Sequence, residues 1–157
     1  MTLQIENLSV ALGGDRHRRL LRAVNLHVEA GEVHGLVGES GAGKSMIGKT
    51  VFGILPRAAK VIEGEVRFRG RDLLKLSARD RRLTAGRQMA LIPQDPLTAL
   101  NPSRRIGAQM TDRLTKIMGE PRATADRRAS TLLDEVHIRH PDRVMASYPH
   151  ELSGGMR

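Results

Sequence analysis

Residues 38–45 read Gly38-Glu39-Ser40-Gly41-Ala42-Gly43-Lys44-Ser45, and this stretch decides the fold because it matches the complete pattern G-x-x-x-x-G-K-[ST]. The apolar run Val33–Val37 comes directly before it and predicts a short strand buried on both faces of a sheet. After it, apolar residues recur at helical spacing until Pro56 ends the predicted helix. The order strand, loop, helix is the context that the pattern requires, and it predicts an α/β fold.

The residue types of this loop suit a phosphate ligand. Glycines let backbone N–H groups turn toward an anion, and the following helix adds the positive end of its dipole. Lys44 reaches the β- and γ-phosphates as a point charge, and the Ser45 hydroxyl is placed to coordinate Mg²⁺. The eight residues 38–45 are therefore predicted to bind ATP or GTP with Mg²⁺. Kinases, GTPases and transport ATPases share such a loop, so it does not name the reaction.

Composition excludes several classes of protein. The chain has 157 residues and a formal charge of +9, which suits one domain or part of a larger one. It has no cysteine, so disulfides, thiolate metal sites and cysteine nucleophiles are excluded. No apolar run approaches the roughly 20 residues that span a bilayer, and we expect a cytoplasmic protein. With three aromatic residues and scattered arginines, the sequence also argues against a protein that binds single-stranded nucleic acid.

Patterning divides the chain into an α/β portion, at about residues 1–94, and a helical portion, at about residues 95–157. Alternating or short apolar runs predict strands in the first portion, and a 3.6-residue period predicts helices in the second. The expected strands are Leu3–Val10, Leu20–Val28, Val61–Arg69 and Met89–Ile92, and the expected helices of the second portion are Ile106–Met118 and Thr124–Val136.

Two further segments resemble the motifs of ATP-binding cassette (ABC) proteins. Leu152-Ser153-Gly154-Gly155-Met156 resembles the signature sequence of that family, and Leu91-Ile92-Pro93-Gln94-Asp95-Pro96 resembles its Q-loop. The phosphate loop, Q-loop and signature follow each other in the family's order, and the resemblance covers essentially the whole chain. It implies an α/β P-loop NTPase of ABC type, in which a mixed sheet core with an antiparallel β subdomain is joined to a helical subdomain.

The resemblance also implies roles and partners. One ATP would lie between residues 38–45 of one cassette and Ser153, Gly154 and Gly155 of a second, identical or different, cassette. Gln94 would reach Mg²⁺ and the attacking water. Transmembrane permease subunits, and indirectly a solute-binding protein, would be the other partners, at the cytoplasmic face of the membrane, and no nucleic acid is expected. Residues 37–45, 94–102 and 148–152 are similar to those of importers of peptides and nickel.

Two features depart from the family. The region Val10–Leu21 has no aromatic residue on which adenine could stack, so Leu12 or His17 is the candidate, and we expect a reduced preference for adenine. The acidic pair that organises Mg²⁺ and polarises water, and the histidine that senses the γ-phosphate, normally follow the signature. Asp134-Glu135 mimics that pair, but it precedes the signature in a helical pattern and is interpreted as a solvated helix face.

The sequence is therefore interpreted as the first two-thirds or less of a cassette whose later core strands are missing. We expect these 157 residues by themselves to be marginally stable and to hydrolyse ATP negligibly. Two alternatives to an importer subunit stay open. One is a truncated remnant that binds nucleotide without hydrolysing it, and the other is a soluble ABC-type ATPase that acts on nucleic acid or ribosomes.

Overall fold

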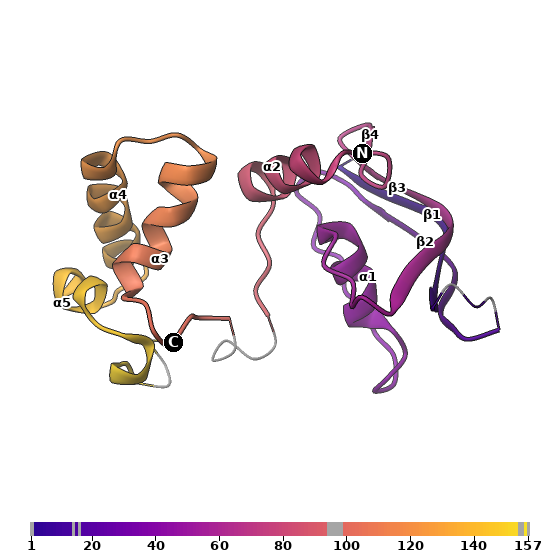
Figure 1. The fold of residues 1–157 in the computed structure, drawn as a ribbon, viewed down its shortest axis with the longest axis horizontal. Helices are drawn as coiled ribbons and strands as arrows, with labels where there is room; N and C mark the ends of the chain where they lie inside the picture. Colours follow the sequence, from indigo (N-terminus) through magenta and orange to yellow (C-terminus); the bar gives the residue numbers. More distant parts are fainter. Residues whose placement is uncertain (1, 14, 16, 94–98, 154–155, 157) are drawn as a thin grey trace. The chain divides into compact units, whose positions relative to one another are not determined.

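The computed structural model describes residues 2–13, 15, 17–93, 99–153 and 156, and it divides the chain into two compact units, residues 1–82 and 83–157 (Figure 1). The first unit holds the sheet and the phosphate loop, and the second is helical. In the described part of the chain, no helix is both long and apolar enough to cross a membrane. Each unit is described below by itself.

The first unit is built on an antiparallel sheet of four strands in the order β2-β1-β3-β4. The strands are β1 (Leu3–Leu12), β2 (Arg19–Val28), β3 (Ala59–Phe68) and β4 (Arg71–Asp72). β1 lies at the centre, where Ile5 pairs with Leu26 on one side and Val66 on the other. Ile5, Leu8 and Val66 are fully buried, so the alternating pattern of the sequence correctly predicted these three long strands.

A bulge in β1 fixes the local register of the sheet. The pairing of β1 with β3 shifts between Glu6 and Ser9, where Asn7 takes a left-handed conformation with φ of 49°. Gly64 of β3 faces this point with φ of 95°, and a Cβ there would lie 2.5 Å from the carbonyl oxygen of Glu6. Only glycine allows the two backbones to approach so closely.

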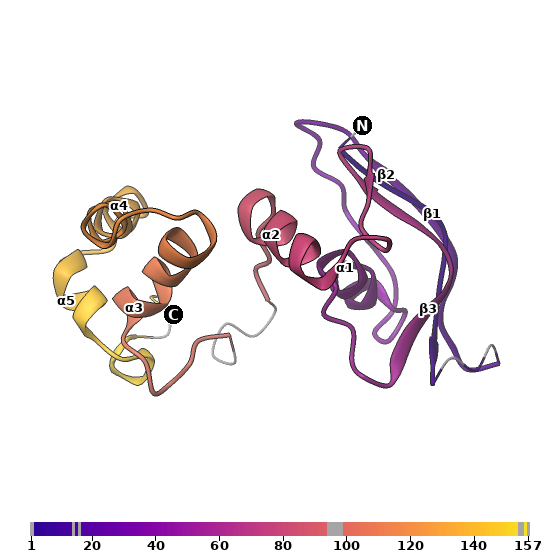
Figure 2. The ribbon, with the colours of Figure 1, turned by 45° about the horizontal axis from the view of Figure 1, so that its top comes forward.

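Helix α1 (Lys44–Phe52) follows the phosphate loop and lies against the sheet (Figure 2). It confirms the predicted helix, although it ends earlier than expected, at Gly53, whose left-handed backbone donates its N–H to the Thr50 carbonyl. Thr50 and Val51 are its buried residues, and the Thr50 hydroxyl bonds back to the Met46 carbonyl.

Two predicted strands are not strands in the structure. Val33–Val37 and Met89–Ile92 have irregular backbone, and their apolar side chains face solvent, with Val33 98%, Val37 99% and Ile92 91% exposed. A strand forms only where a neighbouring strand satisfies its N–H and C=O groups, and the described residues offer neither segment such a partner. Both segments are apolar, but the prediction that they form buried strands is wrong.

Sequence analysis also missed helix α2 (Ala78–Gln88), which spans the boundary between the units. Its arginine-rich sequence has no apolar period, so it gives no helical signal of that kind. Its start is marked by Ser77, whose hydroxyl accepts the Asp80 backbone N–H at 3.1 Å. Arg81 ties the helix to the turn after β4, because its guanidinium donates to the Leu73 and Leu74 carbonyls.

The second unit packs short helices around a small apolar core. Its elements are α3 (Ile106–Asp112), continued by the π-helical turn η2 (Arg113–Ile117), then α4 (Arg122–Glu135), α5 (Pro141–Ala146) and the 3₁₀ turn η3 (Pro149–Glu151). Ile106, Val144 and Leu152 form the core centre. The predicted helices 106–118 and 124–136 are confirmed, whereas α5, which begins at Pro141, was expected only as a break.

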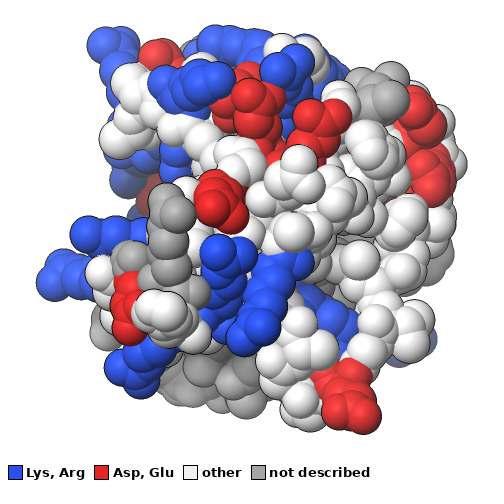
Figure 3. Space-filling model, turned by 90° about the vertical axis from the view of Figure 1, so that its right-hand side faces the viewer, with Lys and Arg blue, Asp and Glu red and all other residues white. Residues whose placement is uncertain are grey.

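Charged side chains of both signs share the face shown in Figure 3. On this face, lysines and arginines are interspersed with carboxylates. Several are paired, as in the contacts of Arg67 with Glu65 and of Lys75 with Asp72. This distribution fits a solvated surface.

Candidate functional site

The phosphate loop is shaped by glycines in conformations that other residues rarely adopt. Gly41 and Gly43 have φ of 86° and 89°. Gly43 is the N-cap of α1 and forms no side-chain cap, so no cap side chain competes with an external acceptor for the N–H groups at the helix start. A Cβ on Gly41 would meet no atom within 4 Å, so the loop is open on that side.

Packing against the sheet fixes the position of this loop. A Cβ on Gly43 would lie 2.6 Å from Cδ2 of Leu21 and 3.0 Å from the Leu20 carbonyl oxygen. Leu21 is buried in β2, so the start of α1 rests directly on the sheet. Inside the loop, the Ala42 N–H donates to the Glu39 carbonyl at 3.2 Å, and the Gly43 carbonyl accepts the Met46 N–H at 2.9 Å.

Lys44 is oriented by the loop itself. Its ammonium donates hydrogen bonds to the carbonyl oxygens of Gly38 at 2.6 Å and Glu39 at 2.7 Å. These contacts curl the side chain over residues 38–43 instead of letting it extend into solvent. The ammonium, the helix N-terminus and the open glycine backbone therefore form one donor-rich region, which suits a phosphate group.

Ser45 lies in the first turn of α1 and is exposed. Its hydroxyl offers a single oxygen ligand to a cation. Among the residues that the structure describes, no group of three or more His, Asp or Glu side chains could hold a metal ion. Mg²⁺ usually takes few protein ligands and completes its shell with phosphate oxygens and water, so this donor set fits Mg²⁺ bound together with a nucleotide.

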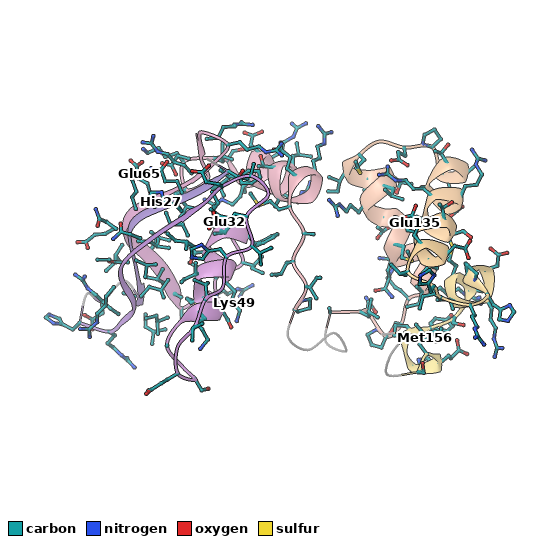
Figure 4. All side chains as sticks on the ribbon, turned by 180° about the vertical axis from the view of Figure 1, so that it is seen from behind. His27, Glu32, Lys49, Glu65, Glu135 and Met156 are labelled. Carbon is teal, nitrogen blue, oxygen red and sulfur yellow. The ribbon has the colours of Figure 1, made fainter. Side chains whose placement is uncertain are left out.

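A second polar cluster precedes the loop. The carboxylate of Glu32 accepts the Glu29 backbone N–H at 2.7 Å and contacts Nδ1 of His34 at 3.1 Å. These two hydrogen bonds, the backbone one first, hold the pKa of the Glu32 carboxyl below its usual value. Glu32 therefore stays ionised at neutral pH and holds the turn after β2, at which the segment leading to the loop begins (Figure 4).

The predicted signature segment lies in the second unit, where the described part of it is anchored by Leu152. This side chain is 6% exposed in the helical core, whereas Ser153 is exposed. The approach to it is fixed by Tyr148, whose ring stacks on His150 and lies under the Arg105 guanidinium at 5.3 Å. These contacts fix the turn that directly precedes Ser153.

Several predicted site residues cannot be placed. Gln94, Gly154 and Gly155 lie outside the described residues.

The two candidates for adenine stacking are both described. Leu12 ends β1 and is half-buried, and His17 is exposed in the following turn, where its backbone N–H donates to the Asp15 carboxylate. The structure brings together residues 38–45, and Ser153 belongs to the other unit.

The interpretation of Asp134 and Glu135 is confirmed. Both lie at the end of α4 and are exposed, and Glu135 is labelled on that helix in Figure 4. Sequence analysis did not single out Arg139 and Arg143, which line a pocket with Ser153. The sequence shows only a short basic stretch there, Arg139-His140 and Arg143, and no motif in it marks a site.

Comparison with known proteins adds sequence relatives. A family model described as ABC transporter matches residues 21–157. A probable peptide ABC transporter ATP-binding protein of Sinorhizobium fredii is 41% identical over 159 residues, covering 100% of this chain and 48% of that protein. The dipeptide transport ATP-binding protein DppD of Escherichia coli is 37% identical over 155 residues, covering 98% of this chain and 47% of that protein. The chain spans about half the length of these curated relatives.

Solved structures share the fold. One, described as the ATP binding subunit of an ABC transporter, superposes with a TM-score of 0.72 at 27% identity and covers 99% of this chain and 57% of that one. Another, an ATP-binding cassette in a dimeric post-hydrolysis state bound to ADP and Pi, gives a TM-score of 0.79 at 20% identity, over 98% of this chain and 64% of that one.

Proposed function

The chain belongs to the ABC transporter family, and on that premise we propose that it is part of the ATP-binding subunit of a peptide importer. The family match confirms the family that the sequence predicted, and the similar solved structure confirms the fold class. The observation that carries the proposal is the glycine loop, with its uncapped helix N-terminus and its inward-held Lys44. Peptide as cargo is supported by the names of the relatives, and nickel or a similar small solute is the alternative cargo.

In this proposal the nucleotide is ATP with Mg²⁺. Residues 38–45 bind its phosphates through backbone N–H groups, and Lys44 neutralises the β- and γ-phosphates. Ser45 and Gln94 supply protein oxygens to Mg²⁺, and Gln94 orients the attacking water. When bound, Mg²⁺ would offset part of the negative charge of the phosphates.

A second cassette completes the site. Ser153, Gly154 and Gly155 of one chain contact the γ-phosphate held on residues 38–45 of another, identical or different, chain. The exposed hydroxyl of Ser153 supports this role, because a partner can reach it. ATP binding would then close the pair, and hydrolysis would reopen it.

Hydrolysis is proposed for the complete assembly and not for these 157 residues alone. The only Asp-Glu pair of α4, Asp134 and Glu135, is solvated at the helix end. We propose that the chain by itself binds nucleotide without turnover. Release of phosphate by the purified chain at a rate that Lys44→Ala abolishes would contradict this.

Permease subunits at the cytoplasmic face of the membrane are the proposed partners of the second unit, with a solute-binding protein acting through them. A pocket of about 400 Å³ between α3–η2 and α4 supports this contact, because adaptable apolar side chains line it and arginines border it. Its apolar lining includes Met110, Met118 and Leu132. Co-purification with two membrane proteins would favour this reading, and co-purification with nucleic acid or ribosomes would favour a soluble ATPase.

Replacement of Lys44 tests the proposed nucleotide site. Lys44→Ala removes the ammonium and should weaken the binding of a fluorescent ATP analogue by at least roughly tenfold, since charge-assisted contacts to phosphate are lost. Lys49→Ala is the matched control, because Lys49 is an exposed lysine of the same helix, outside the loop (Figure 4). Equal affinities of the wild type and Lys44→Ala, with unchanged circular dichroism, would overturn the assignment. Competition with GTP measures the expected loss of adenine preference.

A further inference from the structure

A pocket beside Ser153 carries basic side chains that the proposed nucleotide site does not use. It has a volume of about 480 Å³, and Arg139, His140 and Arg143 line it together with Ser153 and Met156. The basic residues come from the loop before α5 and from its first turns. Arg143 and His140 also border an adjoining hollow, so this corner of the second unit is recessed on both sides.

The walls of the pocket are held by the helical core. Val144 and Leu152 line it and are 5% and 6% exposed, so its floor belongs to the core. The Ser147 hydroxyl donates to the Arg143 carbonyl at 2.8 Å, and the Arg105 guanidinium donates to the Ala146 carbonyl at 2.7 Å. These contacts fix the end of α5 relative to the turn that carries Ser153.

The charges around the pocket are predominantly positive. Within the described ranges, no carboxylate forms an ion pair with Arg139 or Arg143, although Asp142 borders the adjoining hollow. The carboxylate of Glu151, the acidic residue of the pocket lining, accepts the Tyr148 backbone N–H at 2.7 Å. Two arginines that line one recess bring positive charges near each other, and a bound anion would reduce their repulsion.

We propose that Arg139, His140 and Arg143 form a phosphate-binding pocket that extends the contact of Ser153 with a nucleoside triphosphate. The ligand is the nucleotide held on residues 38–45 of a second cassette, so the inference rests on the proposed function and adds residues to it. The guanidinium groups supply paired N–H donors suited to phosphate oxygens, and the Ser153 hydroxyl supplies another donor. His140 lines the same recess, so the NMR resonance of its imidazole can report ligand binding there.

Pyrophosphate is the first probe, titrated calorimetrically into the whole chain carrying Lys44→Ala, which disables the phosphate loop. We expect binding that weakens roughly tenfold when Arg139→Gln and Arg143→Gln are added, because charge-assisted hydrogen bonds are lost. Arg127→Gln is the matched control, since Arg127 is an exposed arginine of α4 outside the pocket. Arg143→Lys should retain part of the affinity, because it keeps the charge without the planar fork.

ATP is the second probe, and it separates nucleotide from free polyphosphate as the source of the phosphate. ATP that binds the Lys44→Ala chain at least as tightly as pyrophosphate, with a matching shift of the His140 imidazole resonance, supports the proposal. Pyrophosphate binding without ATP binding overturns it, as does a pyrophosphate affinity that the arginine variants leave unchanged. Failure of the wild type to bind ATP through Lys44 would instead overturn the proposed function, so the two failures are distinguishable.

Discussion

The central strand β1 and the run Val33–Val37 are both rich in branched apolar residues, yet the structure treats them in opposite ways. Leu8 in β1 is fully buried between β2 and β3, whereas Val33 is 98% exposed. The difference lies in the neighbours, because β1 has a hydrogen-bonded strand on each side and Val33–Val37 has none among the described residues. Apolar composition specifies burial only where the chain also supplies the surface that buries it.

The largest effect is expected from Leu8→Ala in β1. Removal of this fully buried side chain leaves a cavity in the sheet core and should lower the free energy of unfolding by about 2–5 kcal/mol. Chemical denaturation of the intact variant measures the loss of stability, and faster hydrogen exchange in β1 and β3 shows where the loss occurs. A change below about 0.5 kcal/mol would mean that the sheet does not depend on this core.

Gly64→Ala should have the next largest effect, because it tests the register that holds β1 in place. The new methyl group would collide with the Glu6 carbonyl oxygen at 2.5 Å, at a φ that alanine rarely adopts. We expect a loss of more than about 1 kcal/mol, with faster hydrogen exchange near Asn7. Gly70→Ala is the control, since Gly70 also has positive φ but an added Cβ meets nothing within 4 Å. Equal losses in both variants would show that backbone strain alone, and not the close approach, matters at Gly64.

A pH titration extends the comparison to the second unit, where charge pairs support a helix. Arg104 and Lys116 hydrogen-bond the Asp112 carboxylate and lower its pKa from 3.8 to about 2. A lowered pKa in the folded state means that the stabilisation is complete above the unfolded value and is lost as pH falls from about 3.8 toward 2. The helical circular dichroism of the wild type should therefore decline over this range, and Asp112→Asn should lack that component. Because Asp112 is partly exposed, the effect is small.

Sequence reasoning succeeded where structure depends on local pattern. The alternation in residues 3–10 and the helical spacing after Lys44 each predicted their element, and the pattern of residues 38–45 correctly predicted a loop directly before α1. Helix α2 was not predicted, because the features that stabilise it leave no apolar period in the sequence. These features are the cap formed by Ser77 and the side-chain hydrogen bonds of Arg81. The grouping of Arg139 with Ser153 depends on tertiary packing and has no linear signal.

Val33→Ser should give the smallest effect and tests the comparison most directly. The substitution removes an apolar side chain from a segment that the sequence predicts to be buried, yet 98% exposure means that it has almost no packing to lose. The free energy of unfolding should change by less than about 0.5 kcal/mol, in contrast to Leu8→Ala. A loss approaching that of Leu8→Ala would place Val33 in a packed environment and restore the buried strand that its sequence predicts. Together, Leu8→Ala and Val33→Ser test whether an apolar side chain stabilises the fold only where neighbouring strands bury it.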